Sequence, residues 1–330
     1  MVNNAPLTLA VPSKGRLQEH VLAYFADAGL PMRQTRGGRG YRATLEGLPD
    51  IDVHLLSASE IASALLAGEV HMGITGEDLL RESANVLDGQ IALFKALGFG
   101  FANVVVAVPQ AWIDVSDMND LDDVCAAFFQ RHRRRLRIAT KYVNLTRAFF
   151  AKTGIADYRI VESAGATEGA PASGSAEAIV DITTTGATLA ANGLKTLADG
   201  TILESQAQLA ASLSAIWSEK ARDAATRLVT RLAARERATS SLVLRARFDG
   251  DAAGALARLS GEPRVSLLSR PAEGHGEAAF VCPRDLLMQT IAVLREEGAN
   301  GAITAQDADY IFDGGEPLIA RLEQMLPLKG

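Results

Sequence analysis

Short apolar runs alternate with helical patterns along the first part of the chain. Leu7 to Val11 is apolar and ends at polar residues, and apolar side chains then recur at helical spacing from Leu17 to Phe25. The same succession of strand and helix patterns recurs over 52–66 and over 70–80. Such alternation predicts parallel strands joined by helices that cover both faces of a sheet. In sheets of this kind, ligands bind at the carboxyl ends of the strands.

The middle of the chain predicts a second lobe. The apolar run 104–108 is expected to cross into it, and further strands of this lobe are expected at 136–140, 160–162 and 178–182. A strand at 201–204 is expected after the return to the first lobe. A segment rich in Ala and Leu, from about Ala210 to Arg237, predicts one long helix. We expect lobe I to comprise residues 1–103 and 195–240, and lobe II to comprise residues 104–194.

Residues 241–330 predict a separate C-terminal unit. Their strand and helix patterns follow the order βαββαβ, which is typical of a ferredoxin-like α+β module. Modules of this kind often bind small regulatory ligands or form oligomers, but the fold alone establishes neither. The expected fold class is therefore α/β, with two mixed α/β lobes followed by a ferredoxin-like domain.

The composition is that of a globular protein with a mild acidic excess. Hydrophobic residues make up 48% of the chain and charged residues 22%, which allows a large core. A formal net charge of −6 argues against nucleic-acid binding through bulk electrostatics. The basic run Arg131 to Arg135 is expected to be a solvated loop, because acidic segments flank it and no aromatic residues interleave it.

The chain carries no pattern typical of export or membrane insertion. No apolar run approaches the length of a membrane span. The N-terminus lacks the basic and apolar segments of a secretory signal. The two cysteines, Cys125 and Cys282, are far apart and are expected to be free buried thiols. These features predict a cytoplasmic protein without a membrane partner.

The segment 177–189 carries the clearest chemistry. A buried strand runs into a hydroxyl-rich turn, followed by a helix expected from about Leu189; the turn comprises Thr184, Thr185, Gly186, Ala187 and Thr188. Free backbone N–H groups, threonine hydroxyls and a glycine that lets the backbone approach an anion together suit a phosphate. No lysine follows the glycine, so this is not a nucleotide P-loop. The alternative is an ordinary capped helix after a core strand.

Other expected strand ends also carry polar side chains. Asp181 ends the strand before the turn, where its carboxylate could accept hydrogen bonds from ribose hydroxyls. Lys14 and Arg16 follow the first strand, and their positive charges suit phosphate. Other strand ends carry an acid, Asp78, and a further cation, Lys141, which Tyr142 follows. The five histidines show no metal-ligand spacing.

Five motifs in this order closely resemble the ATP phosphoribosyltransferase family, whose members catalyse the first step of histidine biosynthesis. They are Pro12-Ser-Lys-Gly-Arg-Leu17, Gly73-Ile-Thr-Gly-Glu-Asp-Leu-Leu80, Ala139-Thr-Lys-Tyr142 with Asn144-Leu-Thr-Arg147, Glu162 to Pro171, and Asp181 to Leu194. The resemblance covers roughly residues 7–240, and the C-terminal segment looks like the regulatory domain of the family's long form.

The resemblance implies a bilobal core, similar to periplasmic binding proteins, with the active site in its cleft. It implies transfer of phosphoribosyl from phosphoribosyl pyrophosphate (PRPP) to N1 of ATP, with Mg²⁺ required. A homo-oligomer, dimer or hexamer, and inhibition by histidine are also implied. The alternatives are a non-catalytic regulatory or solute-binding protein of the same fold, or a phosphoribosyltransferase for another base.

The resemblance and the chemistry of the residues together predict the site. The PRPP residues are expected to be Glu162, Asp181, Thr184, Thr185, Gly186, Ala187 and Thr188, with the turn holding the 5′-phosphate. The ATP residues are expected to be Arg16, Asp78, Lys141 and Tyr142. Lys14, Arg16 and Asp181 are the expected catalytic residues, the first two by neutralising phosphate charge.

Overall fold

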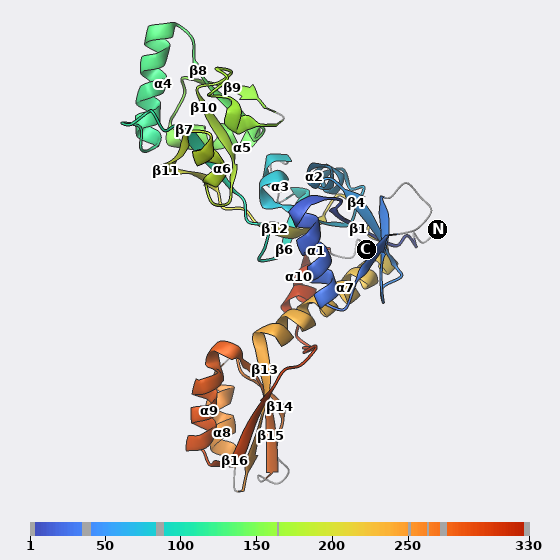
Figure 1. The fold of residues 1–330 in the computed structure, drawn as a ribbon. Coiled ribbons are helices and arrows are strands. Elements are labelled where there is room, and N and C mark those ends of the chain that lie inside the picture. The colour runs from blue at the N-terminus through green and yellow to red at the C-terminus, as the bar shows by residue number, and fades with distance from the viewer. Residues whose placement is uncertain are drawn as a thin grey trace. The chain divides into compact units, whose positions relative to one another are not determined.

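The computed structural model divides the protein into two compact units (Figure 1). It describes residues 4–34, 41–83, 89–163, 165–249, 252–262, 264–270 and 276–326. The first unit comprises Met1–Tyr24, Pro31–Ala224 and Met325–Gly330, and the second comprises Phe25–Leu30 and Ala225–Gln324. The first unit contains two sheets, which define lobe I and lobe II, and the second unit contains a third sheet.

Lobe I is built on a mixed sheet. Its strands are β1 (Leu7–Pro12), β2 (Met32–Gln34), β3 (Arg42–Leu45), β4 (Ile51–Leu56), β5 (Met72–Gly76), β6 (Ile91–Ala96) and β12 (Ala207–Ser212). They follow the order β2-β3-β4-β1-β5-β12-β6. Because β1 runs parallel to β4 and β5, the carboxyl ends of these three strands meet at one edge of the sheet.

Helices α1 (Gly15–Asp27), α2 (Ala58–Ala67) and α3 (Glu77–Ser83) follow the carboxyl ends of β1, β4 and β5. The bounds of α2 are fixed by local chemistry. The Ser57 hydroxyl accepts a hydrogen bond from the backbone N–H of Glu60, whose carboxylate accepts one from the backbone N–H of Ser57. Gly68 ends the helix in the left-handed conformation that glycine tolerates.

The long helix expected from about Ala210 was wrong at its start, because strand β12 occupies Ala207–Ser212. All six of its residues are buried, and it pairs antiparallel with both β5 and β6 in the interior of the sheet. Alanine and leucine favour a helix by propensity, but a segment enclosed between two strands satisfies its backbone through the sheet instead. The long helix is shorter than expected: α7 spans Glu219–Ser240.

Lobe II is built on a second mixed sheet. Its strands are β7 (Asn103–Pro109), β8 (Leu136–Thr140), β9 (Tyr158–Glu162), β10 (Ala178–Thr183) and β11 (Leu194–Leu203), in the order β11-β7-β10-β8-β9. Because β11 pairs with β7, this sheet extends to Leu203, beyond the boundary expected at residue 194. Strands β8, β9 and β10 are parallel, so their carboxyl ends share one edge.

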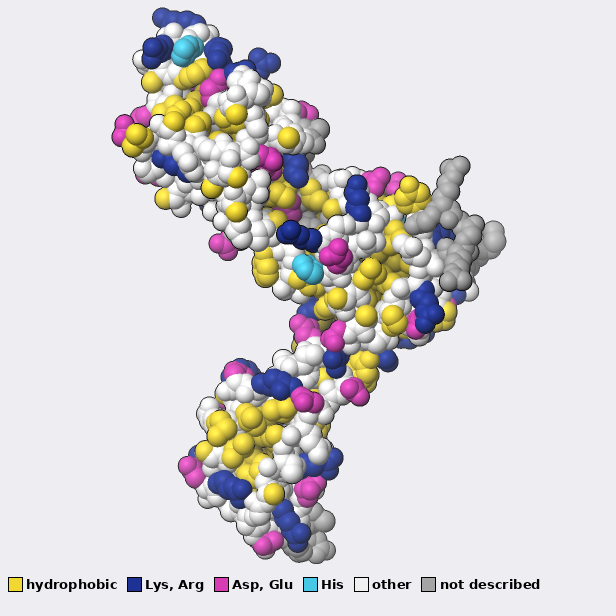
Figure 2. Space-filling model, viewed as in Figure 1, with side chains coloured by type: hydrophobic (Ala, Val, Ile, Leu, Met, Phe, Trp, Pro, Cys, Tyr) yellow, Lys and Arg dark blue, Asp and Glu magenta, His cyan; other side chains and the backbone are white. Residues whose placement is uncertain are grey.

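The helices of lobe II are α4 (Met118–His132), α5 (Val143–Thr153) and α6 (Ala187–Ala191). Helix α4 was not expected from the acidic segment that contains it. Asp117 and Asp120 form a capping box at its start. The basic run lies at its end, where Arg131 is in the last turn and Arg133 is the C-cap, and Lys and Arg side chains gather there on the surface (Figure 2). The run is solvent-exposed as expected, but it ends a helix and is not wholly a loop.

The third sheet confirms the ferredoxin-like expectation. Strands β13 (Ser241–Phe248), β14 (Ser266–Ser269), β15 (Gly276–Pro283) and β16 (Ala299–Gln306) alternate with α8 (Ala253–Ser260) and α9 (Leu287–Glu296) in the order βαββαβ. The strands lie in the order β14-β15-β13-β16, and every neighbouring pair is antiparallel. Helix α10 (Pro317–Met325) follows this sheet in the chain. The second unit takes in most of α7, so it begins before the boundary expected at residue 241.

Of the helices in the described part of the chain, none has the length and apolar composition needed to cross a bilayer.

Candidate active site

The parallel strands of lobe II bring three predicted site residues to one edge. Lys141 follows β8, Glu162 ends β9, and Asp181 lies near the end of β10. Asp181 is partly buried, and burial raises the pKa of its carboxyl group, whereas the hydrogen bond from the N–H of Ile182 and the charge of Lys141 lower it. The carboxylate of Glu168 raises this pKa further. Asp181 therefore lies within electrostatic reach of one cation, Lys141, and of a second carboxylate, Glu168.

The turn after β10 exposes hydrogen-bond donors. Gly186 has φ +76°, and its N–H donates to the Thr183 hydroxyl at 2.8 Å. The Thr184 hydroxyl donates to the carbonyl of Phe101 at 3.0 Å. Within the described residues no protein acceptor faces the backbone N–H of Thr185 or Thr188, and both residues are exposed. An anion can therefore approach these N–H groups directly.

Helix α6 differs from the helix expected after this turn. It begins at Ala187, two residues before the expected start at Leu189, and it ends at Ala191. A helix of little more than one turn has a small dipole, so the anion-binding capacity of the turn rests on its N–H and hydroxyl groups.

The carboxyl edge of the lobe I sheet carries the predicted cations. The N–H of Ser13 donates to the carbonyl of Leu56 at 2.8 Å, which ties the end of β1 to the end of β4. Lys14 and Arg16 follow and are exposed. Hydrogen bonds from Ser57, together with the charge of Lys14, lower the pKa of Glu60, so the Lys14 ammonium lies near the start of α2.

Asp78 and Tyr142 come together, but they contact each other. The Tyr142 hydroxyl donates to Asp78 Oδ2 at 2.7 Å, and the Ser205 hydroxyl donates to Asp78 Oδ1 at 2.9 Å. The Ser205 oxygen also accepts a hydrogen bond from the backbone N–H of Asp78 at 3.0 Å. Tyr142 is 0% exposed and Asp78 is 5% exposed. In this structure their polar atoms face the protein interior and bond to the protein itself. That both residues bind ATP therefore stays a prediction.

Glu82 provides a second link between the lobes. Its carboxylate accepts hydrogen bonds from the backbone N–H groups of Asn144 and Leu145, at 2.9 and 3.0 Å, at the start of α5. Ser205 and Glu82 were not anticipated from the sequence. Ser205 is 127 residues from Asp78, and Glu82 is 62 residues from Asn144, so no local pattern marks either pair.

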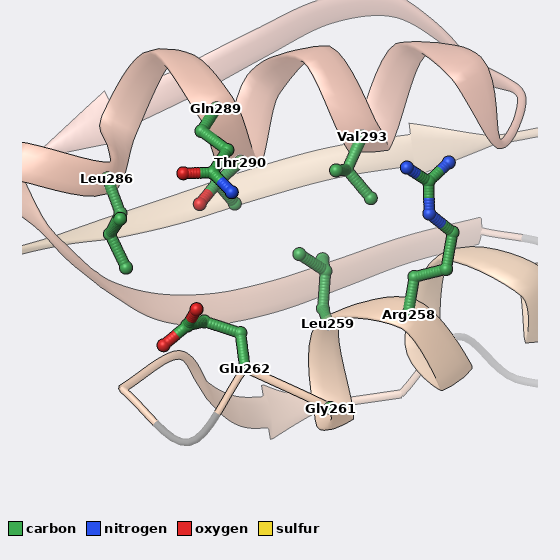
Figure 3. A pocket seen from close by; sticks show the side chains of 8 residues that line it. All are labelled: Arg258, Leu259, Gly261, Glu262, Leu286, Gln289, Thr290 and Val293. Atoms are coloured by element: carbon green, nitrogen blue, oxygen red, sulfur yellow. The ribbon is translucent and has the colours of Figure 1, made fainter.

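A separate cavity of about 330 Å³ lies in the second unit. It opens between α8 and α9 (Figure 3), and apolar side chains line it beside Glu262, Gln289 and Thr290. Arg258, at one end, forms ion pairs with Glu296 and Glu297 at 2.8 and 2.9 Å. The cavity thus combines an apolar lining with a carboxylate, an amide and a hydroxyl, as small-molecule sites often do.

Among the described residues, no three His, Cys, Asp or Glu side chains gather in a way that could hold a metal ion.

Comparison with known proteins gives a consistent result. The family model HisG, ATP phosphoribosyltransferase, matches residues 57–234. The ATP phosphoribosyltransferase of Nitrobacter hamburgensis is 55% identical over 325 residues, covering 98% of this chain and 99% of the relative. That of Bradyrhizobium diazoefficiens is 53% identical over 323 residues, covering 98% and 99%. The solved ATP phosphoribosyl transferase (HisG:HisZ) complex from Thermotoga maritima is 24% identical, with a TM-score of 0.53, and the match covers 68% of this chain and 95% of that chain. The last likeness shows the fold.

Proposed function

The chain belongs to the ATP phosphoribosyltransferase family, and from this premise we propose how its residues carry out the reaction. The enzyme transfers the phosphoribosyl group of PRPP to N1 of ATP and releases pyrophosphate, the first step of histidine biosynthesis. The single observation that carries the residue assignment is the shared carboxyl edge of β8, β9 and β10, which ends in the exposed donor turn.

We propose that the turn from Thr184 to Thr188 holds the 5′-phosphate of PRPP. The exposed N–H groups and hydroxyls there supply donors without the charge of a lysine. Asp181, at the end of the same strand, accepts hydrogen bonds from the ribose hydroxyls, and Glu162 at the end of β9 is the alternative acceptor. These contacts would fix the sugar with its anomeric carbon facing the second substrate.

Lys14, Arg16 and Lys141 supply the positive charge that the reaction needs. Displacement of pyrophosphate at an anomeric carbon passes through an oxocarbenium-like state, so positioning and charge neutralisation matter more than covalent help. We assign Lys14 and Arg16 to the phosphates of ATP or the departing pyrophosphate, and Lys141 to the ATP side of lobe II. Asp78 and Tyr142 belong to the wall beside that site.

Mg²⁺ is part of the same proposal. The ion commonly binds through substrate phosphates, water and one or two carboxylates, and when bound it neutralises charge on the leaving group. Asp181 and Glu168 are carboxylates beside the proposed PRPP site and fit this donor preference. An oligomer of identical chains and a cytoplasmic location complete the proposal.

Histidine is proposed as an inhibitor that binds the C-terminal unit. The cavity between α8 and α9 offers a carboxylate, Glu262, for an ammonium or imidazolium group, and an apolar floor. Removing residues 242–330 should abolish histidine binding. Unchanged histidine affinity in a folded truncated protein would remove this assignment.

The experiment that tests the activity is a steady-state assay with ATP, PRPP and Mg²⁺ that follows phosphoribosyl-ATP by absorbance. We expect turnover that requires the metal and that histidine inhibits. Replacing ATP by other purines and pyrimidines should abolish product. Product with another base, or none with ATP, would refute the proposed substrate pair.

A further inference from the structure

The chain passes between the lobes twice, and the two passages are hydrogen-bonded together. The N–H of Ala102 donates to the carbonyl of Ser205 at 2.9 Å, and the N–H of Ala207 donates to the carbonyl of Phe99 at 2.9 Å. Paired connecting segments of this kind form a narrow hinge, because few covalent links cross between the two sheets. Interactions next to such a hinge control how freely one lobe moves relative to the other.

Three side chains meet beside this hinge, and each comes from a different part of the first unit. Asp78 lies on α3 of lobe I, Tyr142 precedes α5 of lobe II, and Ser205 lies on a connecting segment. The hydrogen bonds between their side chains are 2.7 and 2.9 Å long, and all three residues are at least 95% buried. Hydrogen bonds to a buried carboxylate are stronger than those between neutral groups, and losing one leaves a buried charge poorly satisfied.

Tyr142 also connects this junction to the proposed substrate site. Its ring packs in the core of lobe II, and the ammonium of Lys141 lies 5.0 Å from the ring centroid. Lys141 in turn acts electrostatically on Asp181. Tyr142 therefore contacts Asp78 at the hinge and Lys141 at the carboxyl edge of lobe II, and Lys141 acts through its charge on Asp181.

We propose that Asp78, Tyr142 and Ser205 form an interlobe clasp, a set of positioning residues that fixes lobe I and lobe II at the separation the transfer reaction requires. The clasp rests on the proposed function, in which the cations of lobe I and the phosphate turn of lobe II act on one reaction. A loose hinge would then spread their separations over unproductive values. The carboxylate of Glu82, which caps α5 from lobe I, strengthens the same junction.

The test combines a distance measurement with kinetics on the full-length enzyme. Spin labels at Glu69→Cys in lobe I and Asp123→Cys in lobe II report the interlobe distance, since both positions are exposed. The native cysteines are buried, and burial raises the pKa of Cys125 to about 12, so they react slowly with the label. Tyr142→Phe keeps the ring beside Lys141 and loses only the hydroxyl. It is made in the spin-labelled protein for the distances and in the unlabelled enzyme for the kinetics.

We expect Tyr142→Phe to broaden the distance distribution and to lower kcat about tenfold, with the affinity for PRPP alone unchanged within about twofold. Tyr158→Phe is the matched control, because it removes a hydroxyl from lobe II that makes no contact with lobe I in the described structure. A merely structural role would lower the melting temperature and the active fraction but would leave kcat per active site unchanged.

A wild-type distance distribution in Tyr142→Phe, whatever its kcat, would overturn the proposal, as would a broadened distribution with wild-type kcat. Should that variant fail to fold, Glu82→Ala tests the same junction from a more exposed position and should broaden the distribution in the same direction. The distance readout does not depend on the assignment of ATP and PRPP contacts, so failure of the clasp and failure of the site assignment are separable.

Discussion

Glu177 is the most informative position at which to test how the phosphate turn is held in place. It immediately precedes β10, the strand that carries Asp181 and the turn. Its carboxylate accepts hydrogen bonds from the backbone N–H and the guanidinium of Arg137 on β8, at 2.7 to 3.2 Å. Arg134 donates a further bond at 3.1 Å. The pair therefore fixes the start of β10 against β8.

The magnitude follows from the ionisation of this carboxyl group. Burial alone would raise the pKa of Glu177, but the hydrogen bonds from Arg137 and Arg134 lower it to about 2, against 4.5 for an unperturbed glutamate. Each tenfold change in proton affinity corresponds to about 1.4 kcal/mol. The Glu177 side chain is only 15% exposed, so solvent screening only modestly reduces the stabilisation that corresponds to this lowering of the pKa. We expect Glu177→Gln to destabilise lobe II by roughly 2–3 kcal/mol at pH 7.

The pH dependence has a defined sign. A carboxyl group whose pKa is lowered on folding stabilises the protein fully above its unfolded value, and this stabilisation is lost as the pH falls towards the folded value. The difference between the wild type and Glu177→Gln should therefore be constant above about pH 5 and should shrink between about pH 4.5 and pH 2. Urea unfolding at a series of pH values measures it.

Asp157→Asn is the control from the same lobe. Asp157 pairs with Arg135 at 3.7 Å, and these side chains are 38% and 58% exposed. An exposed pair of this kind contributes less than about 1 kcal/mol. Equal destabilisation by the two variants, or a Glu177→Gln effect that persists unchanged to pH 2, would refute the reasoning.

Three further predictions concern the site and lobe I. Arg16→Ala should lower kcat/KM about 10- to 100-fold through loss of a charge-assisted phosphate contact, whereas Arg42→Ala, an exposed lobe I arginine, should retain wild-type kinetics. Gly186→Ala should weaken PRPP binding measured by calorimetry about tenfold, because φ +76° strains alanine in the turn itself, while Gly193→Ala, with φ +69° after α6, should bind PRPP normally. Burial lowers the pKa of His71, whose imidazole bonds Thr8 and the carbonyl of Ile216. The stability that the neutral imidazole allows should therefore be fully present above about pH 6.5 and decrease as the pH falls below it. His71→Gln should reduce this decrease of the free energy of unfolding with falling pH, measured by urea unfolding.

The sequence was sufficient to predict elements whose pattern is local. The strands that end near Lys14, Lys141 and Asp181 are apolar and end at polar residues, and each is present in the structure. The turn at Gly186 was recognisable because glycine and threonine suit a tight, donor-rich bend. The ferredoxin-like order βαββαβ was likewise visible from alternating strand and helix patterns.

Features set by distant partners were not predictable in the same way. The segment Ala207–Ser212 has helical propensity, and only its position between β5 and β6 makes it a strand. Asp78 and Tyr142 were placed at strand ends, but nothing local indicates that they bond each other across the lobes. Burial and long-range hydrogen bonding decide both cases, and neither leaves a periodic signal in one sequence.

The position of β12 also determines the order in which the protein can be completed during synthesis. The sheet of lobe I gains this internal strand only after the chain has passed through all of lobe II, so β5 and β6 lack their shared neighbour until Ser212 has left the ribosome. Lobe II, by contrast, is contiguous from Asn103 to Leu203 and can pair its strands earlier. Until then the edges of β5 and β6 that face β12 are unpaired, so the nascent lobe I is more exposed to non-native strand pairing than lobe II.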